Sequence, residues 1–355
     1  MKLIKQLGRY PDKARKTYFN TLDNYKDETF QNLIETPALL EGESTLRVLW
    51  NFFKKSPNAI PNIDIPFVKT DLHALSKEEN VLIWFGHSSY FIQVDGKRFL
   101  VDPVFGGNVS PIPHTATSFT GSDAYRVSDM PFIDVLLITH DHWDHLDYAT
   151  VAQLKDKVGC VVCGLGVGQH FEYWGWSKER LIEKNWYDTM ILDNGFEITL
   201  TPARHFSGRL FKRNSSLWTS FVLKTPSKSL FLGGDSGYGP HFKEIGDRYG
   251  PFDLALLECG QYNEKWPYIH SQPHEVMVEV SDLKARSLMP VHHSKFKLAK
   301  HVWNEPLCLI AALAREFQVP LVTPKIGEKV NLEQLDKVWE AWWRDSALHS
   351  SVSNF

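Results

Sequence analysis

The stretch His140-Asp-His-Trp-Asp-His145 decides how the rest of this sequence is interpreted. It directly follows residues 135–139 (Val-Leu-Leu-Ile-Thr), an apolar run with the length and composition of a buried strand. A loop leaving the end of a strand can direct several side chains to one point. Histidine nitrogens and carboxylate oxygens are ligands of zinc-like divalent ions. The stretch therefore predicts half of a two-metal site, and with it a metal-dependent hydrolase.

Three further strand ends carry residues of the same kinds. His205, Asp235 and His292 each come shortly after an apolar, strand-like run. Gly233 and Gly234, directly before Asp235, let the backbone pass close to an ion. One such residue alone would be more typical of a structural role. Four strand ends with His or Asp predict a complete ligand set.

The apolar pattern predicts a β-rich core with helices outside it. Strands are expected at residues 81–85, 90–94, 98–102, 135–139, 160–163, 196–201, 219–224, 229–232, 254–257 and 287–291. Asp95-Gly96 is a hairpin-turn sequence between the second and third of them. Helices are expected around residues 242–248, 274–283, 309–317 and 332–343. This order favours an α/β sandwich with paired sheets inside and helices outside.

Three parts are expected along the chain. Residues 1–75 are polar with scattered apolar positions and prolines, and we interpret them as an N-terminal extension wrapped on the core. Residues 76–330 form the predicted hydrolase domain, and residues 331–355 a C-terminal helix and tail. Trp339, Trp342 and Trp343 have helical spacing, which predicts that this helix packs against the body.

Composition limits the class of protein. The 355 residues are 43% hydrophobic and 23% charged, which is typical of a soluble globular protein. The net charge of −3 gives no reason to expect a nucleic-acid partner. Neither a signal peptide nor a run of membrane-span length is apparent. The four cysteines lack disulfide-like spacing, so a cytoplasmic location is expected, with peripheral membrane contact left open.

Two apparent functional motifs are better explained as parts of secondary structure. Cys160-x-x-Cys163 resembles a zinc or redox pair, but it lies in an apolar run whose residues face alternate ways in a strand. The glycine-rich residues 164–168 lack the pattern of a nucleotide-binding loop, and a strand-to-helix turn is the better interpretation.

From about Trp84 to Pro306, the motif series resembles the metallo-β-lactamase superfamily. Within it, the sequence is similar to the branch of the N-acylphosphatidylethanolamine-hydrolysing phospholipase D. Beyond the residues above, the resemblance includes residues 85–88 (Phe-Gly-His-Ser), 102–105 (Asp-Pro-Val-Phe), 234–238, 242–246, 250–254 and 291–296. It implies a metallo-β-lactamase αββα four-layer sandwich.

The resemblance also implies a ligand set for two divalent metal ions, expected to be zinc. One ion would be bound by His140, His142 and His205, and the second by Asp144, His145 and His292. Asp235 would bridge both and fix their separation. His292 rather than the neighbouring His293 is expected as the last ligand, because its position after Pro290-Val291 matches the family.

Three residues outside the ligand set are compared with the branch. His270 matches a non-ligand histidine near the family's active site, where it would contact the scissile phosphate or assist the leaving group; a surface or capping role is the alternative. His274 departs from the branch, which usually has an acidic residue there. Asp141 stands where the branch more often has Asn; it would alter metal affinity or pH dependence, or simply face solvent.

The expected function is hydrolysis by water activated between two metal ions. A phosphodiester substrate of the N-acylphosphatidylethanolamine type is what the resemblance implies, with a homodimer also compatible with the family. The apolar residues 33, 34, 39, 40, 46, 48–50, 52 and 53 would supply an acyl groove and membrane contact, or a satellite core. The alternatives are a lactonase or soluble phosphodiesterase on the same fold, and an iron-based redox protein, against which His142 argues.

Overall fold

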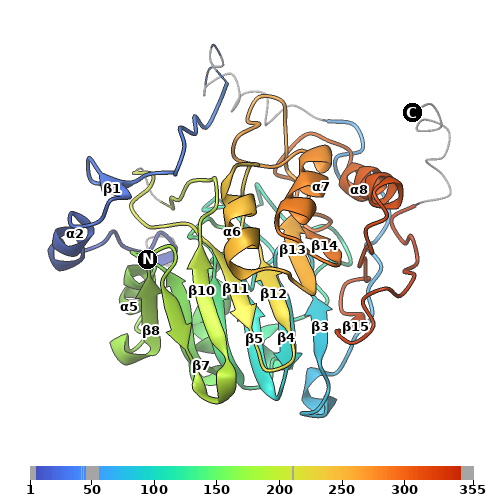
Figure 1. Cartoon of the computed structure of the whole chain (residues 1–355), viewed down its shortest axis with the longest axis horizontal. Coiled ribbons are helices and arrows are strands. Elements are labelled where there is room, and N and C mark those ends of the chain that lie inside the picture. The colour runs from blue at the N-terminus through green and yellow to red at the C-terminus, as the bar shows by residue number, and fades with distance from the viewer. Residues whose placement is uncertain are drawn as a thin grey trace.

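Two β-sheets packed face to face form the centre of the molecule (Figure 1). The structure is a computed structural model and describes residues 5–40, 42, 44, 56–112, 114–209 and 212–344. Within these ranges, the first sheet has seven strands, in the order β15 (Lys329–Asn331), β3 (Val81–Trp84), β4 (Tyr90–Val94), β5 (Lys97–Val101), β6 (Ile133–Ile138), β7 (Val158–Gly164) and β8 (Leu181–Lys184). The second has six, in the order β14 (Leu288–Val291), β13 (Leu254–Glu258), β12 (Ser229–Leu232), β11 (Ser220–Lys224), β10 (Glu197–Thr201) and β9 (Thr189–Ile191).

Helices cover the outer faces of both sheets. The described α-helices are α2 (Lys13–Phe19), α4 (Tyr148–Leu154), α5 (Gly168–Tyr173), α6 (His241–Tyr249), α7 (Pro273–Asp282) and α8 (Glu305–Glu316). Short 3-10 turns are η1 (Leu72–Ala74), η2 (Val127–Asp129), η3 (Lys155–Lys157), η4 (Lys178–Arg180) and η5 (Asp193–Gly195). In Figure 1, α6 and α7 lie in front of the second sheet, with α8 to their right. The expected α/β sandwich is confirmed.

The strand directions bring several strand ends to one edge. β12, β13 and β14 are parallel, and β10 has the same direction because antiparallel β11 separates it from β12. In the first sheet, β5, β6 and β7 are parallel. The loops that follow parallel strands share an edge, where open α/β sheets commonly bind ligands.

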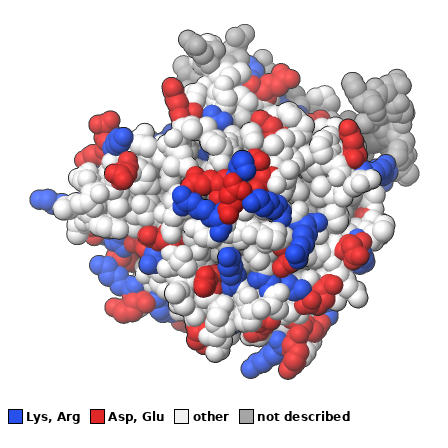
Figure 2. All heavy atoms as spheres, viewed as in Figure 1, with Lys and Arg blue, Asp and Glu red and all other residues white. Residues whose placement is uncertain are grey.

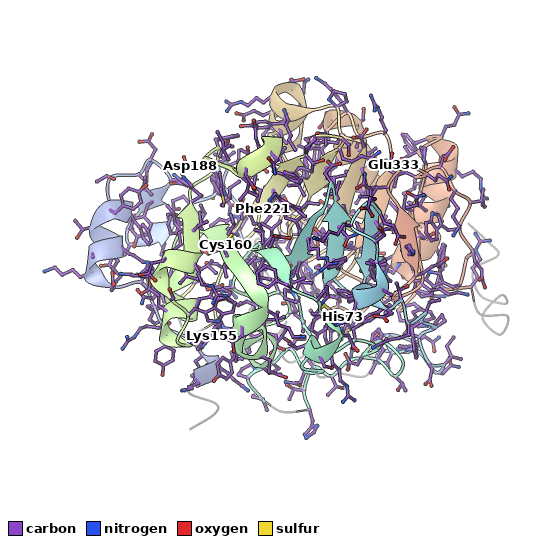
Figure 3. All side chains as sticks on the ribbon, turned by 90° about the horizontal axis from the view of Figure 1, so that it is seen from below. His73, Lys155, Cys160, Asp188, Phe221 and Glu333 are labelled. Carbon is purple, nitrogen blue, oxygen red and sulfur yellow. The ribbon has the colours of Figure 1, made fainter. Side chains whose placement is uncertain are left out.

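Apolar side chains fill the space between the sheets and the space beneath the helices. Seen from below, Phe221 and Cys160 lie towards the middle of the molecule (Figure 3). Cys160 packs against the core cluster between the sheets, whereas Cys163 belongs to the cluster under α4 and α5. The two cysteines therefore face opposite sides of β7, as strand geometry requires. The predicted buried strand is confirmed, and so is the turn that joins β7 to α5.

The predicted hairpin turn and most strands are also confirmed. β4 and β5 pair antiparallel on either side of Asp95 and Gly96, which have φ angles of 49° and 80°. Two consecutive positive φ angles define the tight turn that suits the twist of a hairpin. A small separate hairpin of β1 (Tyr25–Lys26) and β2 (Thr29–Phe30) lies in the N-terminal segment.

The C-terminal helix expected at residues 332–343 is wrong. The backbone there consists of turns and irregular structure, although Trp342 and Trp343 are buried in the main core. Trp342 Nε1 donates to the carbonyl oxygen of Thr323, and Asn304 Nδ2 donates to that of Trp343. Packing of the two side chains and these bonds to the body outweigh the helical spacing of the apolar residues.

The face drawn in Figure 2 carries acidic and basic side chains next to each other. Two ion pairs, Lys243–Asp247 and Arg248–Glu244, lie within α6. Lys284, in the loop after α7, also pairs with Asp247. Such exposed pairs contribute at most about 1 kcal/mol each. Among the described residues, no helix has the length and apolar character needed to cross a lipid bilayer.

Candidate metal centre

The ligand residues expected from the sequence converge at one edge of the sandwich. Residues 140–145 form the loop after β6, and His205, Asp235 and His292 follow β10, β12 and β14. All of them are buried except His142, which is half-buried and borders a cavity. Four loops far apart in sequence therefore supply one site.

Three imidazoles and Asp235 make the first cluster. His142 Nδ1 lies 2.9 Å from His140 Nε2 and 3.3 Å from His205 Nε2. Asp235 Oδ2 lies 3.9 Å from His140 Nε2 and 3.7 Å from His205 Nε2. These four side chains offer ligand atoms that all lie within 4.8 Å of one another.

Asp235 also belongs to the second group of residues. Its Oδ1 atom lies 3.2 Å from His145 Nε2 and 3.2 Å from His292 Nδ1. Asp144 Oδ2 lies 3.5 Å from His145 Nε2. With one carboxylate oxygen facing each group, Asp235 occupies the place of a bridging ligand.

The donor set fits a pair of cations. Asp235 Oδ1 and His145 Nε2 are buried without a hydrogen-bond partner, and such atoms are costly unless something compensates them. Burial lowers the pKa of His140 and of His205 well below the usual value, so both imidazoles are neutral, the state that binds metals. Converging neutral nitrogens and two buried carboxylates suit a divalent ion such as zinc.

Hydrogen bonds behind the ligands fix their orientation. Asp102, at the end of β5, accepts from His145 Nδ1 at 2.8 Å and from the backbone N–H of Thr139 at 2.9 Å. His205 Nδ1 donates to the carbonyl oxygen of Ile269 at 2.8 Å. Each bond turns the opposite ring nitrogen towards the centre, the usual arrangement for metal-binding histidines.

Asp141 faces the protein interior rather than solvent. Its Oδ2 accepts from Ser216 Oγ at 2.8 Å and lies 3.1 Å from His170 Nε2, and its Oδ1 accepts from Gly208 N–H at 2.7 Å. Burial alone would raise the pKa of Asp141, but the bond to His170 and nearby positive charges outweigh it and lower that pKa. Arg209 adds bonds to the backbone of the same loop. Asp141, which stands where the branch more often has Asn, therefore stabilises this loop.

His87 and Glu258 have no role in the sequence prediction but lie at the centre. His87 Nε2 is 2.9 Å from Asp144 Oδ2, and the His87 ring lies 4.0 Å from that of His292. Glu258 ends β13 and is buried beside His270. The rule that found the other ligands, a polar residue at the end of an apolar strand, could have found Glu258. His87 does not follow a strand directly, and its position in a turn with a positive φ of 54° is seen only in the structure.

The two neighbouring histidines separate as expected. His292 faces Asp235, whereas His293 Nε2 donates to the carbonyl oxygen of Pro290 at 3.1 Å. The His293 ring lies 4.9 Å from that of Trp84 in the core. His293 is thus a structural neighbour of the centre.

His270 lies at the entrance of the centre. Its ring stacks on that of His292 with centroids 5.3 Å apart and lies 5.1 Å from that of His205. Burial alone would lower the pKa of His270, but the adjacent Glu258 carboxylate outweighs it and raises that pKa. The structure therefore does not place His270 at the surface. Its side chain is half-buried and packs against two of the expected ligands.

A cavity of about 170 Å³ opens onto these groups. Five of the expected ligands (His142, Asp144, His205, Asp235 and His292) and His270 form its polar wall. The apolar side chains along it are Phe206, Trp266, Ile269 and Leu298. A substrate can therefore reach both clusters from one side, between an apolar wall and a polar one.

The family comparison agrees with this geometry. A model of the beta-lactamase superfamily domain matches residues 97–293, more than half of the chain. The chain belongs to the beta-lactamase superfamily. With the converging ligands, this membership makes it a metal-dependent hydrolase of that superfamily, and it confirms the resemblance found in the sequence.

Relatives place the chain more closely within the superfamily. An uncharacterised protein of Mycobacterium tuberculosis is 34% identical over 326 residues, covering 90% of this chain and 87% of its own length. N-acyl-phosphatidylethanolamine-hydrolyzing phospholipase D 1 of Caenorhabditis elegans is 31% identical over 282 residues, covering 73% of this chain and 75% of its own. The mitochondrial enzyme of that name from Saccharomyces cerevisiae is 31% identical over 257 residues, 69% of this chain and 54% of its own.

Solved structures share the superfamily fold. A metallo hydrolase from Ignicoccus hospitalis aligns with a TM-score of 0.55 at 20% identity, covering 71% of this chain and 97% of that one. A diiron beta-hydroxylase from Streptomyces venezuelae aligns with a TM-score of 0.52 at 21% identity, covering 72% and 54%. At such identities, the likeness supports the fold alone.

Proposed function

We propose that this chain is a two-metal phosphodiesterase of phospholipase D type, acting on lipids similar to N-acylphosphatidylethanolamine. The observation that carries the proposal is Asp235, whose two oxygens face the two ligand clusters at the cavity wall. Two ions bound there would activate a water molecule and stabilise both the attacking and the leaving oxygen of a phosphodiester. We infer zinc from the histidine-rich donor set.

The protein's own groups would orient the reaction. His205 and His292 lie on either side of Asp235, and His270 stacks over the same edge of the cavity. A phosphodiester at the ligand cluster would have His270 beside it, where the imidazole can contact a phosphate oxygen or the departing alcohol. The apolar wall formed by Phe206 and Trp266 would exclude water from the rest of the substrate.

Support for a lipid substrate comes from the N-terminal segment beside the cavity. Asn32 Nδ2 donates to the carbonyl oxygen of His205 at 2.7 Å, and Leu40 N–H donates to that of Lys265 at 2.9 Å. Between these anchors, Leu33 and Ile34 are exposed, with 51% and 38% of their surface accessible. Apolar side chains at the mouth of a site can contact acyl chains or a bilayer surface. The apolar residues 46, 48–50, 52 and 53, to which the sequence assigns the same role, lie outside the described residues.

The test is a substrate-class comparison with metal-loaded protein. We expect turnover of N-acylphosphatidylethanolamine in vesicles to exceed turnover of lactones and of small aryl phosphodiesters. Preference for lactones would overturn the phosphodiesterase proposal, whereas preference for soluble diesters would overturn only the lipid part. A Leu33→Ser, Ile34→Ser variant should lose activity on vesicles and keep activity on a soluble diester.

A redox function on the same fold gives a different result. Metal analysis and an absorption spectrum of the purified protein distinguish it, because an iron centre absorbs visible light and a zinc centre does not. We expect a colourless, zinc-containing protein.

A further inference from the structure

A buried carboxylate stands directly behind His270. His270 Nδ1 lies 2.6 Å from Glu258 Oε2. Glu258 is only 3% exposed and ends β13, the strand between β12 and β14, whose following residues supply Asp235 and His292. A buried carboxylate is costly unless its oxygens are bonded. Its place at this strand end therefore calls for an explanation.

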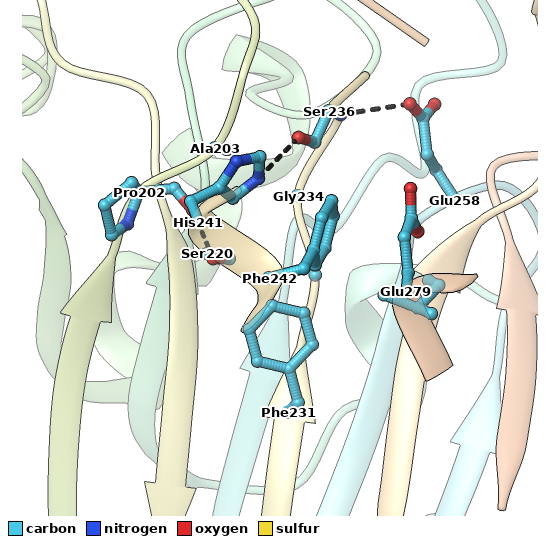
Figure 4. Close-up of a pocket in the computed structure, with 12 residues that line it drawn as sticks. Pro202, Ala203, Ser220, Phe231, Gly234, Ser236, His241, Phe242, Glu258 and Glu279 are labelled. Atoms are coloured by element: carbon cyan, nitrogen blue, oxygen red, sulfur yellow. Dashed lines mark hydrogen bonds between the residues drawn. The ribbon is translucent and has the colours of Figure 1, made fainter. Parts of the chain in front are cut away.

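Hydrogen bonds hold the Glu258 side chain in one orientation. Its Oε1 atom accepts from the backbone N–H of Ser236 at 3.0 Å and from that of Ser271 at 3.2 Å. Figure 4 shows the bond from Ser236, in the loop that carries Asp235, to the Glu258 carboxylate. With Oε1 fixed by two backbone donors, Oε2 is left to face His270. A carboxylate held in this way fixes the ring that it binds.

The fixed ring is aimed at the cavity. Because Nδ1 is bonded to Glu258, the other ring nitrogen, Nε2, is the one left for a substrate. The His270 side chain is 12% exposed and contributes to the cavity wall. This is the arrangement of an orienting carboxylate, a histidine and a reacting group.

We propose that Glu258 is a positioning residue that holds His270 with Nδ1–H bonded to its carboxylate and Nε2 directed at the leaving group of the substrate. The proposal deepens the phosphodiesterase function and rests on it for the identity of the leaving group. In the step, the oxygen of the attacking water forms a bond to phosphorus and the water loses a proton to solvent. The bond from phosphorus to the alcohol oxygen breaks, and His270 Nε2 gives that oxygen its proton. Solvent then returns a proton to His270.

The first test reads the ring itself and does not depend on activity. In zinc-loaded protein with ¹⁵N-labelled histidine, we expect a slowly exchanging, strongly downfield Nδ1–H signal that is absent from His270→Asn. The same signal should be lost in Glu258→Gln: the N–H groups of Ser236 and Ser271 need the amide oxygen as their acceptor, which leaves the amide NH2, a donor, facing Nδ1. A signal that persists in Glu258→Gln would overturn the positioning role, whatever the activity.

The second test compares leaving groups. An alkyl phosphodiester needs a proton on its departing oxygen, whereas p-nitrophenolate leaves without one. We expect Glu258→Gln to lower kcat for the alkyl diester on the order of 100-fold and kcat for the p-nitrophenyl diester far less. The double variant with His270→Asn should lose no more than His270→Asn alone. Equal losses on both diesters would overturn the proposal.

A matched control is available in a second, small cavity, which Glu258 also lines. Glu279 is also buried and lines it together with Glu258 (Figure 4), but it is hydrogen-bonded to Ser271 and not to His270. Glu279→Gln should keep the Nδ1–H signal and the leaving-group pattern. Metal content should stay unchanged in Glu258→Gln; loss of an ion would make Glu258 a ligand instead and overturn its positioning role. If the wild type hydrolyses no phosphodiester but the signal behaves as expected, the proposed function fails and the positioning role stands.

Discussion

The two halves of the metal centre are supported by different parts of the molecule. Asp102, directly after β5 of the first sheet, bonds His145 from behind. Ser88, in the turn between β3 and β4 of the same sheet, places its Oγ 3.0 Å from His292 Nδ1, on the side of that ring that faces Asp235. Asp141 anchors the loop between His140 and His142, and its partners are His170 in α5 and, in a later loop, Gly208 and Ser216. The half with His145 and His292 is therefore supported by the core. The half with His140 and His142 is supported by peripheral segments and also by the core, because Thr139 Oγ donates to Asp102 and lies 3.0 Å from His140 Nδ1.

The peripheral support extends to the N-terminal segment. His170 Nδ1 accepts from the backbone N–H of Arg9 at 3.1 Å, and Arg209 donates to the carbonyl oxygen of Gln6 at 2.9 Å. These contacts join residues more than 160 positions apart. The first half should thus respond to changes far from the ligands, whereas the second should respond to changes in the sheet.

Asp235→Asn should have the largest effect because both halves share this residue. Loss of one carboxylate charge between two cations removes the common ligand, and we expect hydrolysis to fall by roughly 10³-fold or more. Metal analysis after gel filtration should show less than one ion per chain. Retention of two ions with full activity would contradict the shared role, and unchanged circular dichroism would serve as the folding control.

Asp102→Asn and Asp141→Asn should separate the two halves. Each removes one orienting carboxylate, a change that typically weakens metal binding about 10- to 100-fold. We expect the Asp102 variant to weaken one of two binding steps and the Asp141 variant to weaken the other. Competition with a chelating dye measures both steps. The same step affected in both variants would show that the halves are not supported separately.

Arg209→Met tests whether the peripheral contacts matter for folding. The guanidinium is buried and bonds backbone carbonyls of Asp141 and Leu146, which methionine would leave without donors. The expected loss is about 1–3 kcal/mol in the free energy of unfolding, measured by urea denaturation. A matched exposed substitution, Arg286→Met, should change it by less than about 1 kcal/mol. Equal effects would argue against a special role for Arg209.

His241→Gln should have the smallest effect near neutral pH and separates acid unfolding from metal loss. Burial lowers the pKa of His241 to about 3, and it lies outside both ligand groups. The unfolded chain has an ordinary pKa of about 6.5 and takes up a proton that the folded chain does not, so stability falls as pH decreases from about 6.5 towards 3. The variant should reduce this slope by at most about 1.4 kcal/mol per pH unit in metal-free protein. An unchanged slope would show that His241 does not contribute.

Much of this architecture could be predicted because the ligands end apolar strands. Runs such as residues 135–139 and 230–232 are mostly apolar and buried, and residues His140 and Asp235 follow within three positions, so both element and site follow from one pattern. The sequence does not predict β8, β9 and β15, because strands of three or four residues are too short for a pattern to be recognised; β9 is also mostly exposed.

Contacts between distant segments could not be predicted. The partners of Asp141 lie in α5 and in a later loop, and nothing near Asp141 indicates them. Trp339, Trp342 and Trp343 have helical spacing, yet they pack on the main core from irregular backbone, which local pattern does not encode. Glu258 became significant only when the structure placed it behind His270.

Metal titration of chelator-treated protein tests the shared centre most directly. The protein is titrated with zinc in a calorimeter while hydrolysis of bis(p-nitrophenyl) phosphate is followed in parallel. We expect two equivalents to bind per chain, one at His140, His142 and His205 and one at Asp144, His145 and His292, with Asp235 between them, and hydrolysis to reach its maximum only with the second. Saturation of both binding and hydrolysis at a single equivalent would contradict a two-metal centre.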